Sequence, residues 1–225
     1  MKSTLSIVIS LVLVCVASLL SLGCDPQNPY TKPLKIAVLM EIGSDRDLTP
    51  IQWAVDNVNE SGGILGGRPL ELVIEPYQFF DITGEAANEK ARELADAIVA
   101  DDEIVAVIGP GPSSQVAAAA PAFIQGEKVM VSPSSTSGGI VRGLGRYDYI
   151  WRTTESDIAQ AELMLKALAG EQSVSDPKSI GLLTNFGSYG NTFFCWLPYH
   201  GTEYGYEHDS IHVDRYCDST THEGC

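Results

Sequence analysis

Residues 104–136 read IVAVIGPGPSSQVAAAAPAFIQGEKVMVSPSST, and this stretch decides the fold. It contains an apolar strand pattern at Ile104–Ile108, a helix pattern at Ser113–Ile124 and a second strand pattern at Val129–Val131. Buried strands that alternate with helices indicate parallel strands joined by crossover helices. Each strand is followed by a loop rich in Gly, Pro and Ser. In such sheets ligands bind at the carboxyl ends of the strands, so these two loops are where a binding site is expected.

The same alternation precedes this stretch. Strands are predicted at Leu34–Met40 and Leu70–Glu75, and a helix is predicted between them with Thr49 as its N-cap and Pro50 at its first position. A further helix begins at Thr83 and carries a stripe of alanine, leucine and isoleucine at helical spacing. The alternation predicts an α/β fold with a doubly wound parallel sheet and right-handed crossovers.

A second α/β layer begins after this lobe. We predict an extended stretch at Tyr149–Thr153, a helix opened by Ser156, a buried strand at Ser179–Leu183 and a helix from Tyr189 to about Leu197, where Pro198 follows closely. An irregular polar tail is expected from there to the end. Residues 34–150 are therefore predicted to form a first ligand-binding lobe. Residues 151–225 are predicted to form a partial second lobe with a tail that contains cysteine and histidine.

The amino terminus has the pattern of an export signal. Lys2 precedes an apolar run at Ile7–Leu20 that is short for a membrane span. Residues 1–23 are therefore interpreted as a signal peptide, with an uncleaved membrane anchor as the alternative. Cys24 follows a small residue and precedes a polar, proline-rich stretch, which resembles a bacterial lipobox and a lipid-anchored tether over residues 24–33. The alternative for Cys24 is a spare thiol.

The charge of the chain disfavours nucleic acid as a partner. The sequence has 225 residues and a formal net charge of -15. An acidic surface repels phosphate backbones, and no cluster of lysine or arginine offsets it.

The loop Gly109–Ser114 leads directly into a helix. Backbone N–H groups, the positive end of the helix dipole and the hydroxyls of Ser113 and Ser114 would then meet at one place, which suits a carboxylate. Helix capping alone is the alternative for both serines. The loop has neither the dinucleotide-binding spacing nor a phosphate-loop lysine. The second loop adds three adjacent hydroxyl residues, Ser134, Ser135 and Thr136, although such a loop is also common as a plain polar turn.

Five motifs occur in a fixed order: GGILGG, AVIGPGPSS, VMVSPSST, YIWRTTESDIAQ and SYG. Together they resemble the Leu/Ile/Val-binding-protein group of type I periplasmic-binding proteins, from about Leu34 to about Phe194. The resemblance implies two α/β lobes that close on an amino acid or similar solute. It also implies that this chain is shortened at its carboxyl end, so that the second lobe is incomplete.

The resemblance also implies roles for individual residues. Ser113 matches the serine that binds the ligand carboxylate, and Ser134 matches a position that offers its backbone carbonyl to the ammonium. Thr136 matches a threonine that contacts the ligand. Asp157 matches an acidic residue near the hinge that could pair with the ammonium, and Tyr189 matches a second-lobe tyrosine that closes over the ligand. The alternatives are an acidic residue in a helix's first turn for Asp157 and ordinary packing for Tyr189.

The function implied is binding without catalysis and without a cofactor. The chain is expected to be an exported lipoprotein, anchored to the inner membrane, that delivers an amino acid or amide to the permease of an ABC transporter. A sensor ectodomain and a non-functional lobe remain alternatives. A hydrolase is disfavoured because no nucleophile elbow occurs and the histidines lie away from the serine loops.

The histidines and three cysteines fall close to the carboxyl end of the sequence. Metal binding is disfavoured because the spacing matches no zinc pattern and exported chains oxidise their cysteines. A disulfide between Cys217 and Cys225, with Cys195 unpaired, is the preferred interpretation. The residues concerned are His200, His208, His212, His222, Cys195, Cys217 and Cys225.

Overall fold

A computed structural model describes residues 32–41, 45–74, 77–79, 84–143, 148–170, 180–184, 187–206 and 211–215. The predicted signal peptide, Cys24 and the Cys217–Cys225 pair lie outside these residues. The chain divides into two compact units, Met1–Leu34 with Trp53–Glu71 and Lys35–Gln52 with Leu72–Cys225. No helix among the described residues is both long enough and apolar enough to cross a membrane.

The helix α2 spans Asp45–Glu60, so the prediction that it begins at Thr49 was wrong. Pro50 lies inside the helix, where it removes one backbone donor while its fixed φ still suits helical geometry. Gly62 and Gly63 follow the helix, and the N–H of Gly63 donates to the carbonyl of Val58 (2.9 Å). In the same unit, the amide of Asn59 exchanges two hydrogen bonds with the backbone of Leu70, 2.9 and 2.7 Å long.

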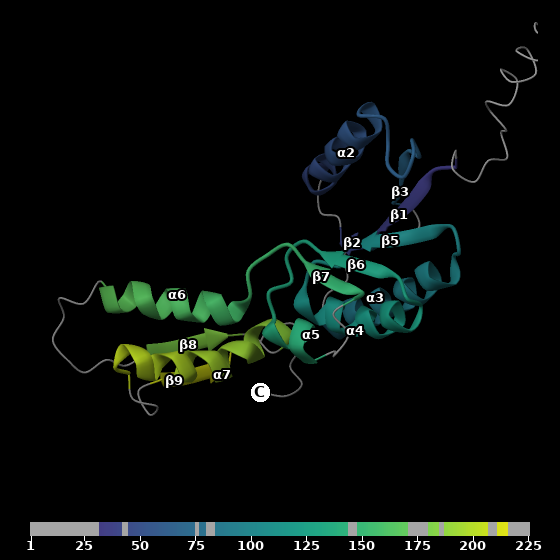
Figure 1. Cartoon of the computed structure of the whole chain (residues 1–225). Helices are drawn as coiled ribbons and strands as arrows, with labels where there is room; N and C mark the ends of the chain where they lie inside the picture. The colour runs from purple at the N-terminus through teal and green to yellow at the C-terminus, as the bar shows by residue number, and fades with distance from the viewer. Residues whose placement is uncertain are drawn as a thin grey trace, which may run out of the picture. The chain divides into compact units, whose positions relative to one another are not determined.

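The main sheet has five strands in the order β3-β1-β5-β6-β7. Its strands are β1 (Leu34–Val38), β3 (Leu70–Val73), β5 (Ile104–Ile108), β6 (Val129–Ser132) and β7 (Ile150–Arg152). The pairs β1–β5, β5–β6 and β6–β7 are all parallel, which confirms the predicted parallel α/β architecture (Figure 1). In this sheet the chain passes from β1 to β3 on one side of β1, and then to β5 on the other side. The direction of the strand order therefore reverses at β1. Loops at such a reversal are where open α/β sheets bind ligands.

Two helices cover one face of this sheet, α3 (Gly84–Ala100) and α4 (Ser113–Gln125) (Figure 1). The stripe of small and aliphatic residues predicted for α3 is buried, and α4 contributes Phe123, which is fully buried. These side chains form one core with the inward residues of the strands, including Val107 and Met130. The core holds the carboxyl ends of β5 and β6 rigidly next to each other, and the two predicted loops begin there.

β7 pairs with β6 and extends the main sheet to Arg152, past the expected lobe boundary at residue 150. Between β6 and β7 lies a short helix, α5 (Gly138–Gly143), that the sequence patterns did not indicate. A separate two-stranded parallel sheet pairs β2 (Met40–Glu41) with β4 (Gln78–Phe79). β2 follows β1, β4 follows β3 and α5 follows β6, and the start of α5 is hydrogen-bonded to Asp157 beside the cavity described below.

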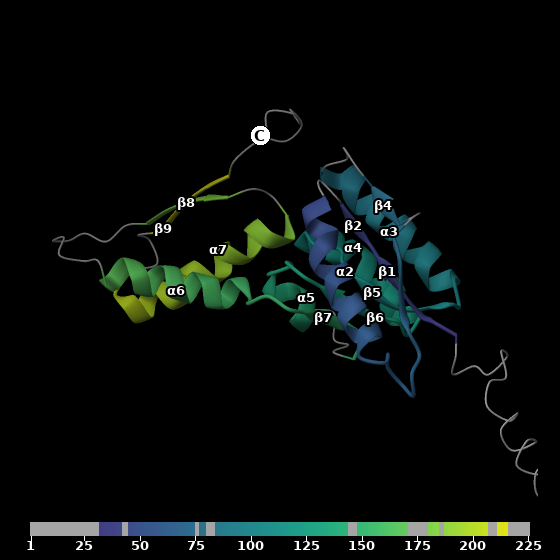
Figure 2. The same cartoon turned by 90° about the horizontal axis from the view of Figure 1, so that it is seen from above.

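The second layer contains α6 (Asp157–Gly170), β8 (Ile180–Thr184), α7 (Ser188–Gly201), the 3-10 turn η1 (Thr202–Tyr204) and β9 (Ile211–Arg215). The helices α6 and α7 lie side by side (Figure 2). They bury a second apolar cluster made of Ala161, Leu165, Phe193, Leu197 and Tyr206.

Two expectations for this layer were wrong. The chain after the last helix is not irregular throughout, because β9 pairs with β8 in parallel from Ile211 to Arg215. The helix α7 also continues past Pro198 to Gly201. Burial of Leu197 in the second cluster outweighs the one backbone donor that the proline removes.

Candidate functional site

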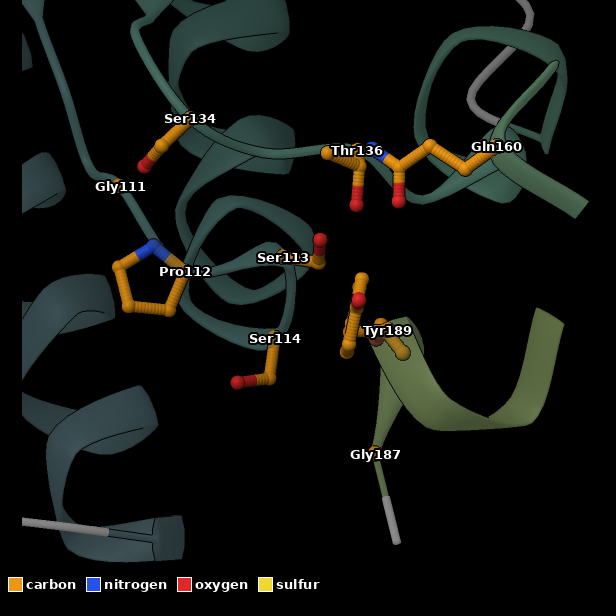
Figure 3. A pocket seen from close by; sticks show the side chains of 10 residues that line it. Gly111, Pro112, Ser113, Ser114, Ser134, Thr136, Gln160, Gly187 and Tyr189 are labelled. Atoms are coloured by element: carbon orange, nitrogen blue, oxygen red, sulfur yellow. The ribbon is translucent and has the colours of Figure 1, made fainter. Parts of the chain in front are cut away.

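A cavity of about 480 Å³ lies at the carboxyl ends of β5 and β6. It is lined by Gly111, Pro112, Ser113, Ser114, Ser134, Thr136, Gln160, Gly187, Ser188 and Tyr189 (Figure 3). These residues come from both predicted loops and from the first turns of α4, α6 and α7. The structure therefore brings together Ser113, Ser134, Thr136 and Tyr189, four of the predicted ligand contacts.

Gly109 makes the turn from β5 into the first loop. Its φ is +99°, and a Cβ atom at this position would lie 1.9 Å from the carbonyl oxygen of Leu39. Only glycine therefore allows the loop to pass this close to the end of β1. The loop reaches α4 at the N-cap Pro112, which has no side chain that can cap the helix. Because the first intrahelical bond is made by Val116, the backbone N–H groups of the first turn remain available beside the cavity.

Ser113 is buried and does not cap α4. Its Oγ accepts hydrogen bonds from the hydroxyl of Ser135 (3.2 Å) and from the backbone N–H of Ser137 (3.3 Å). A serine hydroxyl that accepts two bonds still has its own proton to donate. Figure 3 shows this hydroxyl directed toward Thr136, across the cavity. Ser135 therefore orients Ser113, and it does not itself line the cavity.

Thr136 supplies the second hydroxyl. Its Oγ1 is enclosed and has no hydrogen-bond partner among the described residues. An enclosed polar atom without a partner costs free energy in the empty site, and that cost is recovered when a ligand pairs with it. Thr136 is held by its carbonyl, which accepts bonds from the backbone of Asp157 (2.9 Å) and from the guanidinium of Arg152 (2.8 Å). The loop itself is tied to the first loop because Ser132 Oγ donates to the carbonyl of Pro110 (2.6 Å).

Asp157 does not line the cavity. Its side chain is fully buried, and one carboxylate oxygen accepts a bond from the backbone N–H of Gly138 (2.8 Å). The other oxygen accepts a short hydrogen bond from the hydroxyl of Thr192 in α7. Ser156 Oγ caps α6 by accepting a bond from Ile158 N–H (3.0 Å), as predicted for the residue that opens this helix. The carboxylate of Asp157 is thus engaged with α5 and α7, away from the position expected of a ligand contact.

The N-terminus of α7 is the second uncapped helix end at the cavity. Its N-cap is Gly187, which has no side chain, and the first intrahelical bond runs from Asn191 to Gly187 (3.0 Å). Tyr189 lies in this first turn, lines the cavity and is 45% exposed. Its ring also meets the ring of Phe193 edge to face, with centroids 5.3 Å apart. Tyr189 therefore combines packing within α7 with a surface that faces the cavity.

Sequence reasoning missed two lining side chains that offer both a donor and an acceptor, Gln160 and Ser188. Gln160 lies one turn after Asp157 in α6, and its amide is next to Thr136 in Figure 3. The sequence could have indicated Gln160, because a residue three positions after Asp157 lies on the same face of a helix.

None of the described lining residues carries a charge. Within the described part of the chain, no three His, Cys, Asp or Glu residues are grouped closely enough to hold a metal ion. Cys195 is a free, exposed thiol.

Comparison with solved structures finds binding proteins of this architecture. A substrate-binding protein of an ABC transporter from Desulfitobacterium hafniense, in complex with Leu, has 25% identity and a TM-score of 0.64, over 83% of this chain and 52% of that chain. The branched-chain amino acid transporter substrate-binding protein of Streptococcus pneumoniae, in complex with isoleucine, has 23% identity and a TM-score of 0.62, over 85% and 52% of the two chains. At 23% identity, the likeness to the Streptococcus pneumoniae protein supports the fold alone.

A third structure carries a different ligand. A solute-binding protein of an ABC transporter from Rhodopseudomonas palustris, in complex with 3,4-dihydroxy benzoic acid, has 20% identity and a TM-score of 0.57, over 82% of this chain and 47% of that chain. This chain therefore spans about half the length of the structures that it matches. A search of the curated proteins finds no match.

The sequence profile described as "Periplasmic binding protein" matches residues 47–211, which include every residue that lines the cavity. With the parallel α/β architecture and the likeness to solved type I binding proteins, this match identifies the family. The chain belongs to the periplasmic binding protein family.

Proposed function

We propose that the protein is the solute-binding component of an ABC importer, that it works outside the cytoplasm, and that it binds a small carboxylate-bearing solute without chemical change. The observation that carries this proposal is the pair of uncapped helix N-termini, those of α4 and α7, at one cavity. Both ends offer backbone N–H groups and positive dipole potential, which attract an anion. The volume of about 480 Å³ lies within the range of small-molecule sites.

Three side chains complete the proposed carboxylate site. Ser113 and Thr136 each have a hydroxyl proton that can be donated, because Ser113 Oγ already accepts two bonds and Thr136 Oγ1 has no partner among the described residues. Tyr189 would close over the solute from the first turn of α7. Neutral donors suit this task because they bind a carboxylate without the desolvation cost of a buried cation.

Amino acids of the branched-chain class are the first solutes to test, because two of the matched proteins were solved with Leu and isoleucine. For an α-ammonium, we propose the backbone carbonyl of Ser134 as the acceptor, and Asp157 makes no contact with the solute because it does not line the cavity. Aromatic acids are the second class. A solute with a carboxylate and no ammonium suits a cavity whose described lining is uncharged, and one matched protein was solved with such an acid.

The proposal extends to the route of export. We propose that residues 1–23 are removed and that Cys24 is acylated, which would tether the binding lobe to the inner membrane near its permease. Cys24→Ser should then move the protein from the membrane fraction to the soluble fraction of the cell. Retention of the variant in the membrane fraction would argue against lipidation at Cys24.

The binding site is tested first by a thermal-shift screen of the purified protein against branched-chain amino acids, their amides and hydroxybenzoic acids, followed by calorimetry. The variant Ser113→Ala/Thr136→Ala should lose at least about a hundredfold in affinity for the solute identified, since a buried carboxylate would lose two donors. A matched control, Ser61→Ala/Thr202→Ala, removes two hydroxyls from exposed positions outside this cavity and should bind like the wild type. Wild-type affinity in the first variant would show that the site assignment is wrong.

A further inference from the structure

The buried carboxylate of Asp157 connects three elements. It lies in the first turn of α6, accepts a hydrogen bond from Gly138 at the start of α5, and accepts another from the hydroxyl of Thr192 in α7. Its backbone N–H donates to the carbonyl of Thr136 in the cavity loop (2.9 Å). A fully buried carboxylate needs such donors, because an ionised oxygen without a partner is costly in a low-dielectric interior.

The bonds of Asp157 continue into the cavity. Two consecutive backbone N–H groups diverge at the start of α5: that of Ser137 donates to Ser113 Oγ (3.3 Å), and that of Gly138 donates to Asp157 (2.8 Å). Ser113, which faces the carboxylate of the proposed solute, and Asp157, whose side chain is bonded to α7, are therefore positioned by adjacent peptide groups. On the other side, Thr192 is one turn after Tyr189 in α7, and its hydroxyl is shared between Asp157 and the carbonyl of Tyr189 (2.6 Å), so it links the carboxylate to the first turn of the helix.

Phe193 packs in the apolar cluster shared with α6, but the side of α7 that faces α4 and α5 borders open space. A second cavity of about 330 Å³ is lined by Ala117, Ser137, Gly139, Ile140, Ser188 and Thr192, which belong to α4, α5 with the residue before it, and α7. Where side chains leave space between elements, dispersion contacts are lost and polar contacts take a larger share in fixing the geometry. The bond between Asp157 and Thr192 is the hydrogen bond that the structure gives between α6 and α7 at the edge of this cavity.

We propose that Asp157 is a positioning residue for solute binding. Through Thr192 it holds the N-terminus of α7 at the main cavity, and the Asp157–Thr192 hydrogen bond is the latch of the binding-competent arrangement. This inference rests on the proposed function, because it takes the cavity to be the solute site. Loss of the latch lowers the fraction of molecules in the competent arrangement, and the apparent affinity falls by the same fraction.

The first test compares two substitutions at Thr192. Thr192→Val keeps the branched shape and removes the hydroxyl, and it should weaken the affinity for the solute about tenfold or more, because the buried Asp157 oxygen loses its donor. Thr192→Ser restores the hydroxyl and should bind within about twofold of the wild type. Equal affinity in the valine variant and the wild type, or equal weakening in the serine and valine variants, would overturn the proposal.

A mutant cycle separates the latch from a general loss of structure. In the Asp157→Asn background the carboxylate charge is gone, so Thr192→Val should then cost about threefold or less, because the bond that it removes is neutral. In the Ser113→Ala background, Thr192→Val should keep its full effect, because Ser113 touches the solute and Thr192 does not. A full effect of Thr192→Val in both backgrounds would mean that Thr192 does not act through Asp157.

A measurement without solute keeps this test independent of the proposed function. The N–H of Asn191 makes the first intrahelical bond of α7. In the first turn of α6, the N–H of Gln160 donates to the backbone carbonyl of Ser156 (3.0 Å). In the unliganded protein, Thr192→Val should speed hydrogen exchange at Asn191 about tenfold and leave Gln160 unchanged. If the solute screen fails but this change is seen, the latch stands and the proposed function falls. Unchanged exchange at Asn191 would refute the latch whatever the screen gives.

Discussion

Gly109 is the residue on which the loop between β5 and α4 depends. Replacement by alanine would place a Cβ atom 1.9 Å from the carbonyl oxygen of Leu39, so the loop or the end of β1 must move. We expect Gly109→Ala to lower the free energy of unfolding by about 3 kcal/mol or more, combining backbone strain with a steric clash. Urea unfolding followed by circular dichroism measures this loss.

Gly62 provides the matched control, because its φ is also +99° but no atom lies within 4 Å of a Cβ atom built on it. Gly62→Ala should therefore cost only about 1 kcal/mol, the strain of the left-handed backbone alone. Equal losses in the two variants would mean that the contact with Leu39 contributes nothing.

Ser132 and Ser134 stand two residues apart in the second loop and differ in burial. Ser132 is buried, donates to Pro110 and accepts from the backbone of Ser135 (3.2 Å), whereas Ser134 is exposed. Ser132→Ala should lower the free energy of unfolding by about 1–3 kcal/mol, because two buried backbone groups lose their partner. Ser134→Ala should change it by less than about 0.5 kcal/mol in the same urea titration. A larger loss of unfolding free energy in Ser134→Ala than in Ser132→Ala would contradict the structural role of the Ser132 hydroxyl.

At the scale of elements, the side chain of Lys128 caps the C-terminus of helix α3. Its ammonium donates to the carbonyl of Ile98 (2.7 Å) and, by a shorter bond, to that of Asp101, so it caps the C-terminus of the helix. Lys128→Met keeps the apolar stem and removes both bonds. We expect a loss of about 1 kcal/mol in the free energy of unfolding at pH 7, measured with urea.

The pH dependence provides a second test of this cap. Burial lowers the pKa of Lys128 in the folded protein, and Asp101 and Asp102 partly oppose this shift. The unfolded chain then binds the proton more tightly, so this group makes the wild type more stable as the pH rises through the lowered pKa toward 10.5. The same rise should be absent from Lys128→Met, and an identical pH profile in both proteins would contradict the lowered pKa of this partly buried ammonium.

Element boundaries show where local patterns were insufficient. Strands β5 and β6 and helices α3 and α4 follow the predicted patterns because their apolar periodicity matches one shared core. The prolines of α2 and α7 were interpreted as a helix start and a helix end, yet both lie inside helices. One missing backbone donor costs less than the burial that a continuous helix gains, and that burial is a property of the tertiary structure.

At the scale of the whole molecule, charge should limit stability. The formal net charge is -15, because 29 Asp and Glu residues outnumber 14 Lys and Arg residues. Raising NaCl from about 0.02 to about 0.3 M shortens the screening length and should raise Tm by roughly 2–5 °C. Differential scanning calorimetry at pH 7 measures the shift. The gain should shrink at pH 5, near the isoelectric point of about 4.5, and a salt-independent Tm would show that self-repulsion is unimportant.

Much of the site was already visible in the sequence. Ser113, Ser134 and Thr136 were predicted from their position after two parallel strands, and all three line the cavity. Ser135 was predicted with them and Asp157 from the family resemblance, but the structure gives the polar atoms of both to neighbouring protein groups. A short motif shows which hydroxyls and carboxylates are available, and it does not show which of them become buried partners of one another.

The sequence by itself determined the parallel α/β architecture, the family and the two loops that line the cavity. These depend on periodicity, glycine positions and motif order, which are local properties of the chain. Only the tertiary structure decided that Asp157 joins α5 and α7, that Gln160 reaches the cavity and that β9 pairs with β8. These features depend on contacts between residues far apart in the chain, and such contacts form only when the core brings the elements together.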